Sequence, residues 1–135
     1  MITVTKTVKT IKILVVEDES IVADDIKDSL EQMGYVVSGV ADSGQEAIEK
    51  AALTQPDLVL MDIGLKGKLD GVQAAEEIWI RFNIPIVYLT AHSDSSIAQR
   101  AKITESFGYV TKPFREKELH TAVELSVYRH QLEKN

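Results

Sequence analysis

Three carboxylates follow two apolar segments of the sequence. Glu17 and Asp18 come directly after Ile13–Val16, and Asp62 comes directly after Leu58–Met61. Carboxylates without histidine or cysteine nearby form an all-oxygen site, which favours Mg²⁺ or Mn²⁺ over zinc or copper. A carboxylate can also act as a nucleophile and form an aspartyl-phosphate. If the fold brings the three acids together, they indicate phosphoryl chemistry assisted by a divalent cation.

A hydroxyl group and an amine occupy comparable places later in the chain. Thr90 follows the apolar run Ile86–Leu89, and Lys112 follows the run Phe107–Val110. The amine would neutralise one phosphoryl oxygen and the hydroxyl would hydrogen-bond another, and phosphoryl transfer depends mainly on such positioning and charge neutralisation. Each residue also has a simpler interpretation, because acids at strand ends are often solvated, and an isolated threonine or lysine is usually structural or exposed.

Five short apolar runs predict the strands that would position these residues. Several of them lack polar alternation, as expected for strands of a parallel sheet that is covered on both faces. The runs are Ile11–Val16, Tyr35–Ala41, Leu58–Met61, Ile86–Leu89 and Phe107–Val110.

Segments with helical spacing separate the runs. Val22, Ile26, Leu30 and Met33 draw one apolar stripe, and Gly34 is placed to end that helix. Further helices are expected from an N-cap at Ser43 to before Pro56, and over 72–82, 94–104 and 116–134. The alternation predicts an α/β fold, (βα)5, with a doubly wound five-stranded parallel sheet.

The fold class predicts where a ligand would bind. In doubly wound sheets, ligands lie at the carboxyl ends of the strands, near the point where the strand order reverses. The residues just after the strands are then the Glu17–Asp18 pair, Asp62, Thr90 and Lys112. Their convergence on one edge of the sheet is what the simpler interpretations do not explain.

Composition excludes several classes of protein. The 135 residues are 44% hydrophobic and 27% charged, as in one globular domain, and the absence of cysteine excludes disulfides and thiolate metal sites. With 21 acids against 15 bases, a nucleic-acid-binding surface is not expected. No apolar stretch is long enough to span a membrane and no signal peptide is recognisable, so we expect a cytoplasmic protein.

Four stretches in order resemble response-regulator receiver domains of two-component signalling. They are "ILVVEDES", "DLVLMDIGLKGKLDG", "IPIVYLTA" and "FGYVTKPF", and the resemblance covers about residues 11–132. It implies the flavodoxin-like receiver fold and a signalling domain that takes a phosphoryl group from a histidine kinase or a histidine phosphotransfer protein. No enzymatic activity is expected beyond this self-catalysed phosphotransfer and autodephosphorylation.

The resemblance also implies roles for individual residues. Asp62 would be the phosphoacceptor, and Mg²⁺ would be held by Glu17, Asp18, Asp62 and the backbone carbonyl of Gly64. Thr90 would be the switch hydroxyl and Lys112 would contact the phosphoryl group. Tyr109 would be the aromatic residue coupled to Thr90, and the Lys112–Pro113 peptide bond would be cis.

The sequence departs from the common receiver pattern at a few positions. Glu17 replaces the more usual aspartate, and its extra methylene suggests contact with the ion through water. Gly64 and His92 stand where side chains tune dephosphorylation: Gly64 would leave the attacking water unobstructed, whereas His92 would orient it or simply lie exposed. The loop 64–69 is longer than usual and rich in glycine and lysine.

Separate expectations apply to the two ends of the chain. Residues 1–10 are expected to be a flexible extension, and 11–132 the receiver domain. The helix 116–134 has apolar residues at helical spacing and no evident stop signal. It resembles the last helix of receivers that run on into a sensor or kinase domain, which implies such a continuation or pairing in a homodimer. A free-standing receiver is the alternative.

One other function remains as an alternative, and two more are disfavoured. A receiver-like fold can serve as an interaction module that is not phosphorylated, although such proteins usually lack one of the acids or the lysine. A phosphohydrolase of the haloacid-dehalogenase type would need an acid two residues after its nucleophile, where this chain has Gly64. Flavin mononucleotide binding is disfavoured because the acids after the first strand would repel the phosphate.

Overall fold

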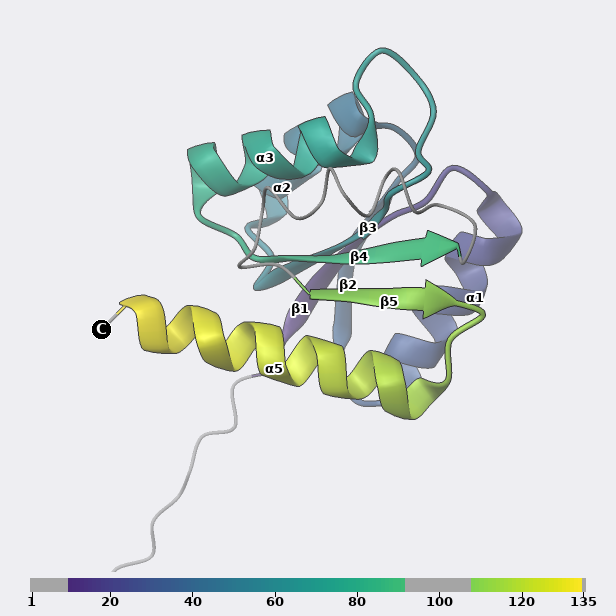
Figure 1. Cartoon of the computed structure of the whole chain (residues 1–135), viewed down its shortest axis with the longest axis vertical. Coiled ribbons are helices and arrows are strands. Elements are labelled where there is room, and N and C mark those ends of the chain that lie inside the picture. Colours follow the sequence, from purple (N-terminus) through teal and green to yellow (C-terminus); the bar gives the residue numbers. More distant parts are fainter. Residues whose placement is uncertain (1–9, 92–107, 135) are drawn as a thin grey trace, which may run out of the picture.

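The computed structural model describes residues 10–91 and 108–134, and these form one sheet with helices on both faces (Figure 1). The expected helix 94–104 and His92 lie outside the described residues. The elements in chain order are β1 (Lys12–Val16), α1 (Ser20–Gln32), β2 (Val36–Ala41), α2 (Gly44–Thr54), β3 (Leu58–Asp62), α3 (Gly71–Phe82), β4 (Ile86–Ala91), β5 (Gly108–Lys112) and α5 (Glu116–Lys134).

The sheet has the predicted doubly wound topology. Its five strands are all parallel and lie in the order β2-β1-β3-β4-β5, so the order reverses at β1. Chain direction and strand order therefore bring the carboxyl ends of β1 and β3 side by side. This is the place where doubly wound sheets bind ligands.

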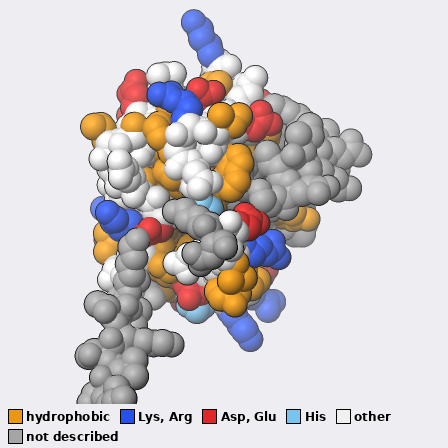
Figure 2. Space-filling view, turned by 90° about the vertical axis from the view of Figure 1, so that its left-hand side faces the viewer, with side chains coloured by type: hydrophobic (Ala, Val, Ile, Leu, Met, Phe, Trp, Pro, Cys, Tyr) orange, Lys and Arg blue, Asp and Glu red, His pale blue; other side chains and the backbone are white. Residues whose placement is uncertain are grey.

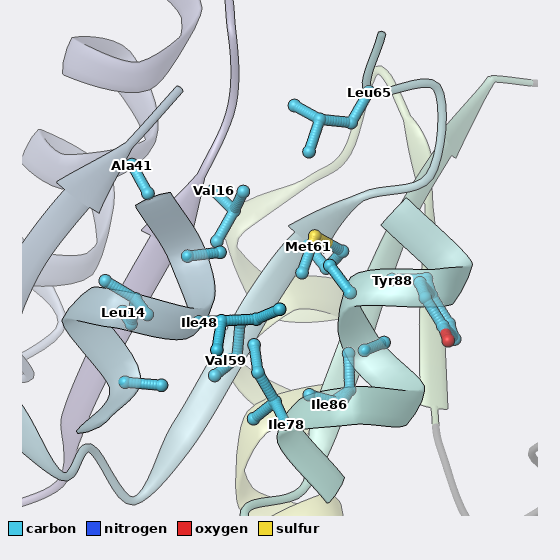
Figure 3. Close-up of a cluster of buried hydrophobic side chains, with 14 of the residues drawn as sticks. Leu14, Val16, Ala41, Ile48, Val59, Met61, Leu65, Ile78, Ile86 and Tyr88 are labelled. Atoms are coloured by element: carbon cyan, nitrogen blue, oxygen red, sulfur yellow. The ribbon is translucent and has the colours of Figure 1, made fainter. Parts of the chain in front are cut away.

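Alternate residues of the central strands supply two separate cores. On one face, Leu14 and Val16 pack with side chains of α2 and α3, including Ile48 and Ile78 (Figure 3). On the other face, residues such as Ile13 pack with the helices α1 and α5. Burial on both faces explains why these strands read as continuous apolar runs.

Local signals fix the helix ends as predicted. The Ser43 hydroxyl accepts a hydrogen bond from the Glu46 N–H at 3.1 Å and so caps α2. Gly34 follows the C-cap of α1 with a φ of 93°, a conformation that costs glycine little. The described residues contain no helix that is both long and apolar enough to cross a membrane.

Three strands extend further than predicted. Asp62, Ala91 and Lys112 are the last residues of β3, β4 and β5, although the sequence suggested that they follow the strands. Backbone pairing continues through these residues, and Asp62 lies opposite Leu89 in the register. The polar side chains are therefore held by the sheet itself, which positions them more rigidly than a loop would.

The start of α3 lies directly against the end of β3. Asp70 caps the helix in a reciprocal arrangement with Gln73. Gly71, the first helical residue, approaches the backbone of Asp62 so closely that a Cβ atom there would clash with the Asp62 carbonyl oxygen and lie 3.1 Å from the Ile63 Cα. A residue without a side chain is therefore required where the two elements meet.

We predict that Gly71→Ala lowers the free energy of unfolding by about 1–3 kcal/mol, because the new methyl group must displace backbone. Gly39→Ala is the matched control, since a Cβ at Gly39 would meet its nearest neighbours at 3.6 Å, an ordinary contact distance. Urea unfolding followed by fluorescence of the single tryptophan measures both. Equal midpoints for the two variants would contradict the tight contact.

Candidate functional site

Glu17 is a buried acid at the end of β1, with only 2% of its surface exposed. Its N–H donates to the Ala41 carbonyl at 2.9 Å, so pairing with β2 continues past the strand. One carboxylate oxygen accepts from Lys112 Nζ at 2.8 Å, and the other accepts from the Glu19 N–H at 3.2 Å. Burial of this charge is tolerated because both oxygens have partners.

Lys112 joins the end of β5 to two acids on other strands. Its Nζ lies 2.8 Å from Glu17 Oε1 and 3.6 Å from Asp62 Oδ1. Burial alone would lower the pKa of this lysine, but the hydrogen bond to Glu17 and the charges of Asp62 and Glu17 raise it above the ordinary value. Lys112 is therefore an ammonium group at neutral pH, available to neutralise negative charge at this edge.

Asp62 lies between these groups as the last residue of β3 and is 8% exposed. Its Oδ1 accepts a hydrogen bond from the Gly64 N–H at 3.0 Å. The contact of Gly71 with its backbone fixes the main chain from the α3 side. A carboxylate held in this way has a defined orientation and partial access to solvent, as a nucleophile requires.

The acids form a donor set that fits a hard divalent cation. Glu17, Asp18 and Asp62 each place a carboxylate oxygen within 4.8 Å of the others. Two like charges at such a separation repel by roughly 3 kcal/mol at an effective dielectric of about 20. Asp18 is exposed and lines, with Glu17, a hollow of about 270 Å³. The set of three oxygens fits Mg²⁺ or Mn²⁺.

The remaining predicted residues lie on or directly after β4 and β5. Thr90 is 9% exposed near the end of β4, and its hydroxyl donates to the Ala91 carbonyl at 3.2 Å. Tyr109 on β5 is 65% exposed. The Lys112–Pro113 bond is cis, as the resemblance implied.

Three further features lie in loops beside the site. Gly64 is exposed, and a Cβ at this position would lie 3.5 Å from Asp62 Oδ1. Lys66 and Lys68 are exposed and line a shallow hollow with the start of α2. Glu19 is exposed at the N-cap of α1, without a side-chain hydrogen bond to the helix.

Sequence reasoning missed two features of the site. The ion pair between Lys112 and Glu17 joins residues 95 positions apart, so no local pattern signals it. The contact of Gly71 with Asp62 was also missed, although the Asp70-Gly71 pair after a loop is a recognisable helix start.

Comparisons with a family model and with a known protein both point to the same protein family. The sequence model of the response regulator receiver domain matches residues 13–124. The transcriptional regulatory protein PdtaR of Mycobacterium tuberculosis (strain H37Rv) is 41% identical over 118 residues, which cover 87% of this chain and 57% of PdtaR. The chain thus spans little more than half the length of this relative.

Solved structures resemble the fold closely. The signal receiver domain of a modulated diguanylate cyclase from Desulfovibrio desulfuricans G20 is 38% identical with a TM-score of 0.87, covering 93% of this chain and 99% of that one. The N-terminal domain of a response regulator/sensory box/GGDEF 3-domain protein from Carboxydothermus hydrogenoformans is 37% identical with a TM-score of 0.80, covering 92% and 99%.

We predict that Asp18→Asn raises the free energy of unfolding of the metal-free protein by on the order of 0.5–1 kcal/mol, because it removes one of three clustered negative charges. Urea unfolding with a chelator present measures the change. Asp28→Asn, at an exposed acid further along α1, is the control and should change stability less. A destabilised Asp18→Asn variant would show that repulsion is not the dominant interaction.

Proposed function

The chain belongs to the response regulator receiver domain family, and from this premise we propose that Asp62 is its phosphoacceptor. Receiver domains of this family are signalling domains of two-component systems and interact with histidine kinases or phosphotransfer proteins. The proposed reaction is transfer of a phosphoryl group from a phosphohistidine on such a partner to the carboxylate of Asp62.

One observation carries the proposal: Asp62 lies within 4.8 Å of two further carboxylates and 3.6 Å from the ammonium group of Lys112. In the proposed step an oxygen of Asp62 forms a bond to phosphorus while the phosphorus–nitrogen bond of the donor breaks. The donor imidazole leaves with the electron pair of that bond and takes up a proton. Positioning and charge neutralisation by the surrounding residues would promote this transfer.

The acids would hold the divalent cation. Asp18 and Asp62, with the backbone carbonyl of Gly64, are the proposed ligands of Mg²⁺, and Glu17 would contribute through water. When bound, the ion supplies positive charge that neutralises phosphoryl oxygens. Glu17 already pairs with Lys112 in this structure, which supports a role for Glu17 in holding the lysine toward Asp62.

The proposed switch uses Thr90 and Tyr109. Phosphorylation of Asp62 would draw the Thr90 hydroxyl toward the phosphoryl group. Tyr109 is largely exposed on β5, and its inward rotation would alter the surface formed by β5, α5 and the segment 94–104. The segment 94–104 lies outside the described residues.

We also propose that the receiver is one part of a larger protein. Residues 11–132 would form the receiver domain, residues 1–10 an extension, and α5 a connection to a following domain in a cytoplasmic protein. PdtaR, which is named a transcriptional regulatory protein, is considerably longer than the matched segment. One structural neighbour is the N-terminal domain of a 3-domain protein, which supports the same organisation.

Incubation with acetyl phosphate and Mg²⁺ should add one phosphoryl group to the wild-type chain. We expect Asp62→Asn to abolish this addition because the amide is not an effective nucleophile, while Asp28→Asn, an exposed acid of α1, retains it. Intact-protein mass spectrometry followed by peptide mapping locates the modification. Labelling that persists in Asp62→Asn would assign the acceptor to another residue.

Mg²⁺ binding separates this function from that of an unphosphorylated interaction module. The wild-type chain should unfold at a higher temperature with Mg²⁺, and Asp18→Ala should lose most of this shift. Absence of any Mg²⁺-dependent shift, together with no labelling, would favour the interaction module.

Gly64→Leu should slow hydrolysis of the phosphorylated protein at least roughly threefold, corresponding to about 0.7 kcal/mol of activation free energy. The reason is that a side chain at this position begins 3.5 Å from Asp62 Oδ1 and would obstruct the attacking water. Lys66→Leu introduces the same side chain two residues later and is the control. Decay of the phosphorylated mass measures the rate, and equal lifetimes in the two variants would be evidence against an unobstructed approach over Gly64.

A further inference from the structure

A hollow of about 360 Å³ lies at the edge of the sheet where the strands begin, opposite to the edge that carries Asp62. It is lined by the segment 55–57 before β3, by the segment 82–85 before β4, and by residues near the end of α5. Its volume falls within the range of small-molecule pockets, about 300–1,000 Å³. The length of β3 separates it from Asp62 by roughly 17 Å, so it is distinct from the acid cluster.

The C-terminal ends of two helices meet at this hollow. Gln55 is the C-cap of α2 and Asn83 is the C-cap of α3, and both line it. The helices run opposite to the strands, and α3 and α5 end on the side where β4 and β5 begin (Figure 1). A helix C-terminus carries about half a negative elementary charge. The last turn of α2 contains no basic residue, so its own sequence does not compensate this charge.

Asp57 adds a carboxylate to these surroundings. Its Oδ2 accepts a hydrogen bond from the Lys12 N–H at 2.8 Å, which holds the side chain beside the start of β1. A carboxylate can accept about four hydrogen bonds, so it can hold this backbone group and an ammonium group together. Neither lysine nor arginine occurs among the described residues that line the hollow. Its charge therefore favours a cation.

Arg81, the base in the last turn of α3, is engaged beside the hollow rather than in it. Its Nη1 lies 3.7 Å from Glu77 Oε1, and its guanidinium carbon lies 5.1 Å from the centre of the Phe82 ring. Arg81 thus compensates an acid of its own helix. Its position over Phe82 also shows that an aromatic ring of this region accepts a cation.

The walls fit an organic cation better than a metal ion. Asp57 is the one carboxylate among the described lining residues, and hard divalent cations are usually held by several oxygens that include more than one carboxylate. Figure 2 views the molecule from the side on which α3 and α5 end, and hydrophobic and uncharged polar side chains make up much of the described surface there. Apolar surface in the hollow comes from Pro56, Phe82, Pro85 and Val127, and amide groups come from Gln55, Asn83 and Gln131.

We propose that this hollow binds a small organic ammonium ion, a primary amine on a short apolar chain. The ammonium group would donate to the Asp57 carboxylate and to the amide oxygen of Asn83, while the methylene groups would lie against Phe82 and the prolines. An ammonium group has three donors and no acceptor, which matches a carboxylate, amide oxygens and helix C-termini. The apolar walls select the chain, and the negative surroundings select the charge.

Nuclear magnetic resonance titration of the isotope-labelled chain tests the site. Butylamine and diaminobutane are the probes, butanol is the uncharged control, and saturating Mg²⁺ occupies the acid cluster. Either amine should cause saturable shifts of the backbone amides of Asp57, Asn83 and Gln131, whereas butanol should not. Tighter binding of diaminobutane would further assign the ligand to the diamines.

Two outcomes of this titration overturn the proposal. Equal shifts with butanol and butylamine would show that the charge is not recognised. Amine-dependent shifts confined to the acids Glu17, Asp18 and Asp62 would show that the amines bind there instead.

Asp57→Asn should weaken amine binding by about tenfold or more, because it removes a charge-assisted hydrogen bond while its amide oxygen can still accept from Lys12. Asn83→Gly keeps the left-handed backbone conformation and should weaken binding roughly threefold. Glu31→Gln, at an exposed acid near the end of α1, removes the same charge outside the hollow and is the control. Circular dichroism confirms that each variant is folded. Equal affinities of Asp57→Asn and Glu31→Gln would overturn the proposal.

The amine site does not rest on the proposed phosphorylation of Asp62. Acetyl phosphate labelling of Asp57→Asn reads the two proposals separately. Labelling should remain while amine binding is lost, and failure of labelling in a wild-type chain that binds the amines would concern Asp62 alone.

Discussion

Three carboxylates lie at the carboxyl end of one parallel sheet, and the ammonium group of Lys112 lies among them. Their mutual repulsion opposes the fold at the point where β1 and β3 end. The pairing of Lys112 with Glu17 offsets part of this repulsion and allows an almost fully buried acid. Because Glu17 directly follows β1 and Lys112 ends β5, the pair forms only when the whole strand order is in place. The site and the topology therefore depend on each other.

Features that depend on local sequence could be predicted well. The central strands are buried on both faces, so their apolar runs identify them without tertiary information. The stripe from Val22 to Met33 and the cap at Ser43 define two helices through contacts within a few residues. The assignment to the receiver family and its fold followed from motifs in the correct order.

The convergence of Glu17, Asp18 and Asp62 on one edge was predicted from the fold class, but specific contacts between distant residues were not. Polar residues suggested that strands end before Asp62 and Thr90, yet the backbone remains paired through both. The partner of Glu17 was inferred to be a bound ion, and the structure adds Lys112, 95 residues away. Gly71 carries no sequence signal for its contact with Asp62, because only the folded approach of α3 to β3 creates it.

Because of the contact at Gly71, the residues on the two sides of Asp62 differ in how easily they can move. On the α3 side, backbone meets backbone with no space for a methyl group, so that boundary is stiff. On the other side, Asp62 pairs with Leu89, beside Thr90, and the next strand carries the exposed ring of Tyr109. An exposed ring such as that of Tyr109 can rotate without moving main chain. The proposed change at the Asp62 carboxylate would therefore meet fixed backbone toward α3 and a rotatable side chain toward β5.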